Sequence, residues 1–167
     1  MTDNIKKADQ LFFDADNKIK QNLLIEAKEM LEKAISINPK HGRSYNHLGW
    51  LYETKYQDYT KAEEYYKKAL EYEPNYPAAN INYAILLSTM EKDAELEKVL
   101  QKAEQVPGIN KRDVYNEYGM MHEKKKEFDK AIKYYQKVLN VTYNNNDIQA
   151  FKDAIERCKM KKEMFAK

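Results

Sequence analysis

Cysteine, long apolar runs and export signals are all scarce in this chain. Its one cysteine, Cys158, cannot form an internal disulfide and leaves no cysteine cluster for a structural zinc ion. No stretch approaches the roughly 18 unbroken apolar residues of a membrane span, and the opening segment MTDNIKKADQ is too polar for a secretory signal. These absences predict a soluble protein of a reducing compartment, the cytoplasm, without membrane contact.

An excess of charge of one sign is also missing. The sequence has 29 Lys and Arg against 27 Asp and Glu, for a formal charge of +2, and the signs are interspersed along the chain. No long-range field therefore favours nucleic acid or anionic lipid, and we predict neither as a partner. Basic residues do crowd the end of the chain, at Lys152, Arg157, Lys159, Lys161 and Lys162. Because acidic residues interrupt them, we interpret this segment as a solvated terminal helix.

Residues that carry chemistry are few and scattered. The sequence contains no glycine-rich phosphate loop and no serine elbow. The histidines His41, His47 and His122 lie in different repeats of the pattern described next, and none has a partner at metal-ligand spacing. His122 is expected to be a packing residue, and Cys158 falls in an apolar helical stripe, which predicts a buried thiol. We therefore expect no enzyme activity, no metal and no cofactor.

What the sequence does contain is an internal repeat of 34 or 35 residues. One small-residue position recurs at Ala15, Gly49, Ala84 and Gly119. Three further positions keep nearly the same steps: Ala27, Ala62, Leu96 and Ala131; Leu31, Tyr66, Leu100 and Tyr135; and Ala34, Ala69, Ala103 and Val138. Four copies of one repeat therefore follow one another along the chain.

Each repeat carries two apolar stripes of helical period, separated by a short polar turn. The first three repeats are closed by helix breakers, which are Pro39, Pro74 and the pair Pro107 and Gly108. The pattern predicts helices at about 4–20, 23–37, 42–55, 59–72, 77–90, 92–105, 111–124, 127–141 and 147–165. One of the polar residues 145–147 is expected to cap the last helix.

Two of the repeats share a pattern of large and small residues. The second, YNHLGWLYETKYQDYTKAEEYYKKALEYEP, has Tyr45, Leu48, Gly49, Tyr52, Ala62, Tyr66, Ala69 and Pro74. The fourth, YNEYGMMHEKKKEFDKAIKYYQKVL, has Tyr115, Gly119, Phe128, Ala131 and Tyr135. These residues resemble the signature of the tetratricopeptide repeat, and the resemblance covers about residues 8–143.

Three of the repeats depart from that signature. The second has one extra residue between its glycine and its first alanine. The third has Asn80 where an aromatic residue is usual and Leu96 where alanine is usual. The first has Asp14 and Lys18 in positions that are normally apolar, so its first helix departs most from the pattern.

The resemblance implies an all-α fold, a right-handed α-solenoid of helix-turn-helix repeats with a C-terminal capping helix. We expect a single domain, 1–167, with repeats at about 8–41, 42–75, 77–110 and 112–145 and a capping helix at about 147–165. Small residues such as Gly49 and Gly119 let the two helices of a repeat approach closely, and alanines face the large rings. Most of the 14 tyrosines are therefore expected in the core, with the hydroxyl at its edge.

A partner is expected in the groove that the first helices of successive repeats line. The signature residues point into the stack, so the opposite helical stripe must face the groove. That stripe comprises Asp9, Phe12, Phe13, Asp16 and Ile19; Arg43, Asn46, His47, Trp50 and Glu53; Ala78, Ile81, Asn82, Ile85 and Ser88; and Asp113, Asn116, Glu117, Met120 and Glu123. From it we predict a site for a protein or peptide formed by Phe12, Arg43, Asn46, His47, Trp50, Ile81, Asn82, Ile85, Asn116 and Met120.

Apolar and amide side chains distinguish this stripe from an ordinary charged surface. Phe12 and Trp50 are apolar where the packing of the repeat does not require it, and aromatic residues of this kind are favoured anchors. Asn46, Asn82 and Asn116 offer both a donor and an acceptor to an extended backbone. The alternative is that the two aromatic residues pack against a neighbouring repeat and the asparagines only face water.

One ligand known for the family is not expected here. A two-carboxylate clamp holds the acidic C-termini of heat-shock chaperones through lysine, asparagine and arginine side chains of three repeats. The second to fourth repeats supply only Asn82, and Asp113 and Glu117 stand where cations are needed. Their charge would repel the ligand, and the first three repeats match no better.

The leading hypothesis is a scaffold or adaptor whose groove takes an apolar extended segment, which could also be basic. One alternative is a small cytoplasmic chaperone of the secretion type, because such proteins are similar in size and also end in a lysine-rich helix, here KMKKEM. Another is a structural module that pairs with a second copy. We expect a monomer or a weak homodimer.

Overall fold

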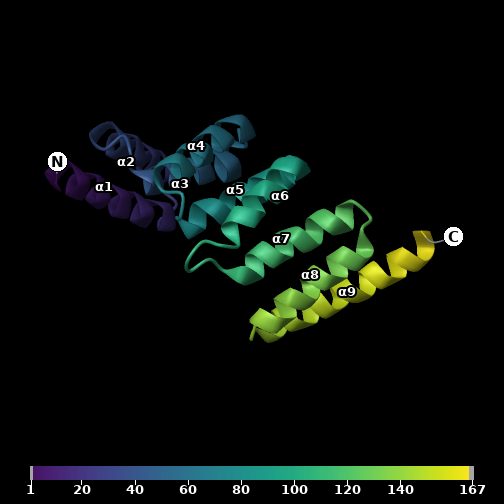
Figure 1. The fold of residues 1–167 in the computed structure, drawn as a ribbon. Helices are drawn as coiled ribbons and strands as arrows, with labels where there is room; N and C mark the ends of the chain where they lie inside the picture. The colour runs from purple at the N-terminus through teal and green to yellow at the C-terminus, as the bar shows by residue number, and fades with distance from the viewer. Residues whose placement is uncertain (1, 166–167) are drawn as a thin grey trace. The chain divides into compact units, whose positions relative to one another are not determined.

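Helix is the only regular secondary structure in residues 2–165, the part of the chain that the computed structural model describes (Figure 1). The elements are α1 (Thr2–Lys20), α2 (Leu24–Ile37), α3 (Gly42–Leu51), the π-helix η1 (Tyr52–Tyr56), α4 (Tyr59–Tyr72), α5 (Pro77–Thr89), α6 (Asp93–Ala103), α7 (Lys111–Lys124), α8 (Phe128–Val141) and α9 (Asn145–Phe165). The predicted all-α fold is confirmed, and each predicted helix end lies within two residues of an observed one. Residues 1, 166 and 167 of the predicted domain lie outside the described residues.

The chain divides into two compact parts, with the division inside α5. The N-terminal unit, residues 1–86, contains the pairs α1–α2 and α3–α4 and most of α5. The C-terminal unit, residues 87–167, contains the end of α5, then α6, the pair α7–α8, and α9. A single domain over residues 1–167 therefore stays a prediction.

The core of the N-terminal unit is built from the signature positions of the first two repeats. Ala15, Ala27 and Leu31 of the pair α1–α2 contact Leu48 and Leu51 of α3, and all five side chains are fully buried. Burying one such leucine stabilises the fold by about 1.5–3 kcal/mol. The helical stripes predicted to point into the stack therefore do so in this unit.

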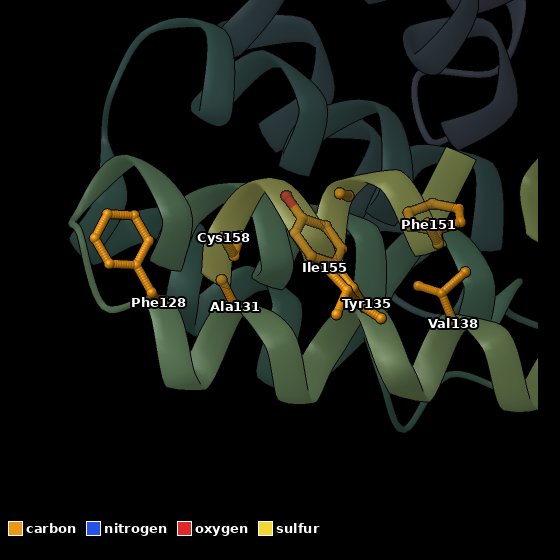
Figure 2. Close-up of a cluster of buried hydrophobic side chains, with 8 residues drawn as sticks. Phe128, Ala131, Tyr135, Val138, Phe151, Ile155 and Cys158 are labelled. Carbon is orange, nitrogen blue, oxygen red and sulfur yellow. The ribbon is translucent and has the colours of Figure 1, made fainter. Parts of the chain in front are cut away.

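In the C-terminal unit the capping helix α9 is packed on α8 (Figure 2). The cluster joins Phe128, Ala131, Tyr135 and Val138 of α8 to Phe151, Ala154, Ile155 and Cys158 of α9. Cys158 is fully buried, and burial raises the pKa of its thiol to about 11. The predicted buried thiol is thus confirmed, in a contact that holds the last helix on the repeat before it.

Two glycines mark the closest approach of paired helices. A Cβ atom on Gly49 would lie 2.7 Å from the ring of Tyr66, and one on Gly119 would lie 2.4 Å from the ring of Tyr135. Both rings are buried, and both separations are too short for any side chain. Each glycine is therefore required by the tyrosine on the second helix of its own repeat.

The extra residue of the second repeat is absorbed by the π-helix η1. The Tyr66 hydroxyl donates to Glu53, 13 residues earlier, at 2.6 Å, and the Tyr135 hydroxyl donates to Glu123, 12 residues earlier, at 2.9 Å. The wide turn of a π-helix takes up one residue more than an α-helical turn. The two repeats therefore keep the same tyrosine–glutamate contact although their lengths differ.

A left-handed residue recurs in the turn inside every repeat. Asn22, Gln57, Glu91 and Lys126 have φ angles of 61°, 53°, 57° and 61°. In three of these turns the amide of the next residue donates to a backbone carbonyl of the preceding helix, with an N–O distance of 2.9 Å. The pairs are Leu23 to Lys18, Lys92 to Leu87, and Glu127 to His122. This is the Schellman arrangement, in which glycine is the usual left-handed residue. Of the residues found here, only asparagine adopts that conformation readily.

Replacing Glu91 by glycine is expected to stabilise the protein. Its side chain is exposed, and glycine would relieve the left-handed strain, for a gain in the free energy of unfolding of about 0.5–1 kcal/mol. The matched control is Glu97→Gly, in the exposed middle of α6, which should cost about 1 kcal/mol. Urea unfolding measures both, and a loss of stability in both variants would contradict the strain assigned to Glu91.

The cap of α9 differs from the expectation. The helix begins at Asn145, and the side-chain oxygen of Asn144 accepts hydrogen bonds from the amides of Asn146 and Asp147, at 2.8 and 3.3 Å. Asn144, and not one of residues 145–147, is the capping residue. The carboxylate of Asp147 is instead bonded to the Arg112 guanidinium at 2.7 Å, which ties the start of α9 to α7.

Candidate functional site

An open hollow of about 310 Å³ lies on the N-terminal unit, where three helices contribute side chains. Its lining consists of Asp16 and Ile19 of α1, Asn46, His47 and Trp50 of α3, and Ala78 and Asn82 of α5. These are the first helices of three successive repeats. All seven residues belong to the stripe expected to face the groove, and four of them belong to the narrower predicted site.

Helical spacing explains why these residues meet. Within each helix they lie three or four positions apart, or next to one another, and so share one face. The opposite face of α3 carries Leu48 and Leu51, which are fully buried in the core. Because that face is fixed by packing, Asn46 and Trp50 are turned to the hollow.

Two asparagines from successive repeats are joined across the hollow. The Asn82 side-chain amide donates to the side-chain oxygen of Asn46 at 3.1 Å. Asn46 is only 2% exposed, whereas Asn82 is half-buried. Asn82 lines the hollow, and its side-chain oxygen has no hydrogen-bond donor among the described residues, so it remains an available acceptor.

The charge of the hollow comes from one carboxylate. Asp16 lies 2.6 Å from the Lys20 ammonium and 3.4 Å from the ring of His47, and the hydrogen bond from Lys20 is the main cause that lowers the pKa of Asp16. Burial lowers the pKa of His47, with Asp16 acting more weakly in the opposite direction. At neutral pH the lining is therefore an ionised Asp16 beside a neutral imidazole.

Trp50 forms the apolar wall of the hollow and is the chain's single tryptophan. Its ring is half-buried and packs against the core cluster of α1, α2 and α3. The ammonium of Lys55 lies 5.6 Å from the ring centroid, within the range of a cation–π contact. One part of the indole is thus fixed by the core while another part remains open.

The predicted residues Phe12 and Arg43 lie together in a different place. Phe12 is 6% exposed, and its ring centroid lies 4.7 Å from that of His47 and 5.6 Å from that of His41. With Arg43 and residues 73–77 it lines a second hollow of about 580 Å³ on the N-terminal unit. Most of the Phe12 ring therefore contributes to the core, which is the packing alternative that the sequence left open.

The remaining predicted residues are spread over two helices. In the N-terminal unit, Ile81 of α5 is half-buried and Ile85 is 39% exposed. In the C-terminal unit, Asn116 of α7 is half-buried, and its amide donates to the Met120 sulfur at 3.9 Å and to the Glu117 carboxylate at 3.4 Å. The asparagines thus pair with side chains instead of only facing water.

Four of the five basic residues singled out in α9 form hydrogen bonds within the C-terminal unit. Arg157 and Lys161 both donate to Glu123 at 2.8 Å, Lys162 donates to Asp129 at 2.6 Å, and Lys159 donates to Glu156 at 2.6 Å. Glu123 also accepts from Tyr135. Acidic side chains of the same unit therefore accompany these four cations, and the interpretation of α9 as a solvated cap stays a prediction.

His41 and His122 serve local structure. His41 is the N-cap of α3, since its Nδ1 accepts from the Ser44 amide at 3.3 Å. His122 is buried, stacks on Tyr134 and lies 2.6 Å from the Glu127 carboxylate, so its packing role is confirmed. Within residues 2–165 no group of three or more His, Cys, Asp and Glu side chains is placed to hold a metal ion. No helix in that range has both the length and the apolar character needed to cross a membrane.

The predicted site omits two features of the observed hollows. The first is a set of three lining residues of the smaller hollow that belong to the stripe but not to the predicted site, namely Asp16, Ile19 and Ala78. The pattern of a single helix does not show which residues a second helix brings close. The other is the segment 73–77, which lines the second hollow and comprises the turn after α4 and the first residue of α5. Only its proline-rich turn, which places the chain at a helix end, could have drawn attention to it.

Comparison with known sequences returns one family. One profile of the tetratricopeptide repeat matches residues 15–41 and 42–76, and a second matches residues 112–145. Together the matches span more than half of the chain. No curated protein sequence matches it.

Solved structures share the fold over nearly the whole chain. PilF of Pseudomonas aeruginosa has a TM-score of 0.83 and 19% identity, and the match covers 98% of this chain and 72% of that one. MamA has a TM-score of 0.75 and 19% identity, covering 98% and 87%. PilW, a widely conserved type IV pilus biogenesis factor, has a TM-score of 0.72 and 17% identity, covering 93% and 76%. At these identities the likeness concerns the fold alone.

Proposed function

Since the chain belongs to the tetratricopeptide-repeat family, we propose that it is a scaffold or adaptor that holds an extended segment of a partner protein against its first helices. Repeats of this family are protein-interaction modules and are generally non-enzymatic, and we propose the same here. The partner lies along the inner faces of α1, α3 and α5 in the N-terminal unit. Asn116 and Met120 of α7 stay a predicted further contact.

The observation that carries this proposal is the composition of the hollow. It combines a half-buried indole with a hydrogen-bonded pair of asparagines, in which the oxygen of Asn82 has no donor among the described residues. Partly buried aromatic residues are the usual anchors of protein interfaces. Amide groups beside such an anchor suit the unpaired N–H and C=O groups of an extended segment. A surface that served only to keep the protein soluble would need neither feature.

The double variant Trp50→Ala with Asn82→Ala is expected to weaken capture of the partner from cell extract roughly thirtyfold or more, because truncating a buried anchor costs about 2 kcal/mol or more. Trp50 also packs partly on the core, so circular dichroism must show that the variant remains folded. Asn82→Ala alone removes the hydrogen bond to the buried Asn46, so its folding is checked in the same way, and it should give a smaller loss in the same direction.

The control for this experiment replaces Lys159, Lys161 and Lys162 by glutamine. Their partners lie within the C-terminal unit, so capture should change little. If capture survives the double variant and disappears with the lysine variant, the recognition element is α9 and the proposal is wrong.

Static light scattering tests the alternative of a self-associating module, since a dimer has twice the monomer mass without any partner. Co-expression separates the chaperone alternative, since a chaperone would make its substrate soluble.

A further inference from the structure

The hollow on the N-terminal unit has an unequal charge. Asp16 is its single ionised lining residue, and about a third of that side chain is exposed. His47 beside it is kept neutral by burial, and the other lining residues are amides or apolar side chains. A bound group therefore meets one negative charge and no positive one in the lining itself.

The cation that now accompanies Asp16 is held loosely. Lys20 lies one helical turn along α1, with a side chain that is 68% exposed. Exposed pairs of this kind are weak because water and salt screen them and because ordering a lysine costs entropy. A cation from a partner can share or replace this contact without disturbing the fold.

The rest of the hollow suits the other parts of a long basic side chain. Ile19, Trp50 and Ala78 offer apolar surface for an aliphatic stem. The indole of Trp50 already has the Lys55 ammonium 5.6 Å from its centroid, which shows that a cation can reach this ring. The free oxygen of Asn82 is an acceptor, and guanidinium and ammonium groups are donors only.

We propose that this hollow receives a long cationic side chain, arginine or lysine, from the partner's extended segment. The proposal rests on the function proposed above and adds the chemistry of the residue that occupies the hollow. An acidic side chain would be repelled by Asp16, and a small apolar one would give neither its carboxylate nor the Asn82 oxygen a further donor. The proposed partner segment is therefore basic at one fixed position.

Selection of random displayed peptides on the immobilised full chain tests this directly. The expected result is a set of enriched peptides with arginine or lysine at one position. Asp16→Asn should abolish that preference. The matched control is Asp14→Asn, on the same helix, where the carboxylate accepts a hydrogen bond from Gln10 and does not line the hollow. This control should leave the preference unchanged.

A second measurement uses one selected peptide and its copy with citrulline, which keeps the shape of arginine without its charge. Trp50 fluorescence reports binding at the hollow, because no other tryptophan is present. We expect the citrulline peptide to bind roughly tenfold more weakly to the wild type, and both peptides to bind equally to Asp16→Asn. Circular dichroism checks that this variant is folded.

The outcomes separate the two proposals. Enriched peptides that depend on Trp50 and Asn82 but show no basic position would overturn this inference and leave the proposed function standing. A basic preference that survives Asp16→Asn would also overturn it. Peptides that bind equally well to the Trp50→Ala and Asn82→Ala double variant, or the absence of any enrichment, would count against both proposals.

Discussion

Gly119→Leu is expected to lower the free energy of unfolding by about 3 kcal/mol, the upper part of the range for overpacked sites. Leucine has the higher helix propensity, so the backbone alone would predict a gain of about 1 kcal/mol. The Cβ atom, however, would already lie 2.4 Å from the Tyr135 ring before any further side-chain atom is placed. Since Tyr135 is 2% exposed and surrounded by the α8–α9 cluster, its ring cannot move aside without opening that core.

Thermal and urea unfolding measure this loss, and Gln136→Leu is its control. Gln136 is exposed on α8, so leucine there adds apolar surface without a clash. A second test combines Gly119→Ala with Tyr135→Leu. If the ring is the obstacle, the double variant should lose less stability than the sum of the single changes. An unchanged or raised melting temperature for Gly119→Leu would mean that α7 and α8 are not in close contact at this residue.

Glu123→Gln is expected to cost about 2–3 kcal/mol at neutral pH. The pKa of Glu123 is lowered to about 2 from an ordinary value of 4.5. The largest cause is the hydrogen bond from Arg157, followed by those from Lys161 and Tyr135. Without screening, a pKa shift of this size would contribute about 3 kcal/mol to the free energy of unfolding at neutral pH. The smaller figure allows for screening, because the side chains of Arg157 and Lys161 are 47% and 43% exposed.

The same carboxylate sets a dependence on pH. A lowered pKa means that the folded state favours the charged form, so the contribution is fully present above pH 4.5 and is lost as the pH falls through about 2. Over this pH range, the free energy of unfolding from denaturation curves should therefore fall more steeply with decreasing pH in the wild type than in Glu123→Gln.

Glu53 provides the matched control for this charge. It accepts from Tyr66 as Glu123 accepts from Tyr135, but burial raises its pKa and none of the causes is a cation. Glu53→Gln should therefore cost little. Equal losses in Glu53→Gln and Glu123→Gln would show that the tyrosine hydroxyl, and not the basic residues of α9, is the important contact.

Much of the helical architecture could be predicted because it depends on contacts between residues close in sequence. Breakers such as Pro39 and Pro74, together with the apolar period, located the helix ends. The left-handed conformation of the turn residues could not be predicted, because glutamine, glutamate and lysine, found at Gln57, Glu91 and Lys126, rarely adopt it. There the Schellman bonds of the helix end determine the conformation, and the side chain only tolerates it.

The candidate site was predictable as a surface but not as a set of contacts. Helical spacing placed Asn46, Trp50 and Asn82 on one stripe, and the structure brings these three to one hollow. The Asn46–Asn82 bond and the burial of Phe12 depend on the distance between helices of different repeats. Such distances follow from the side chains that fill the core, which a periodic pattern does not determine.

The buried position of Cys158 makes its alkylation a probe of how often α9 opens. Its thiol is sealed between α8 and α9, and its raised pKa keeps it protonated at neutral pH. Only the thiolate of an exposed cysteine reacts with an alkylating reagent, so modification has to wait until α9 lifts from α8. Because the sequence has no second cysteine, the rate of alkylation at saturating reagent measures how often α9 separates from α8, whether locally or as part of global unfolding.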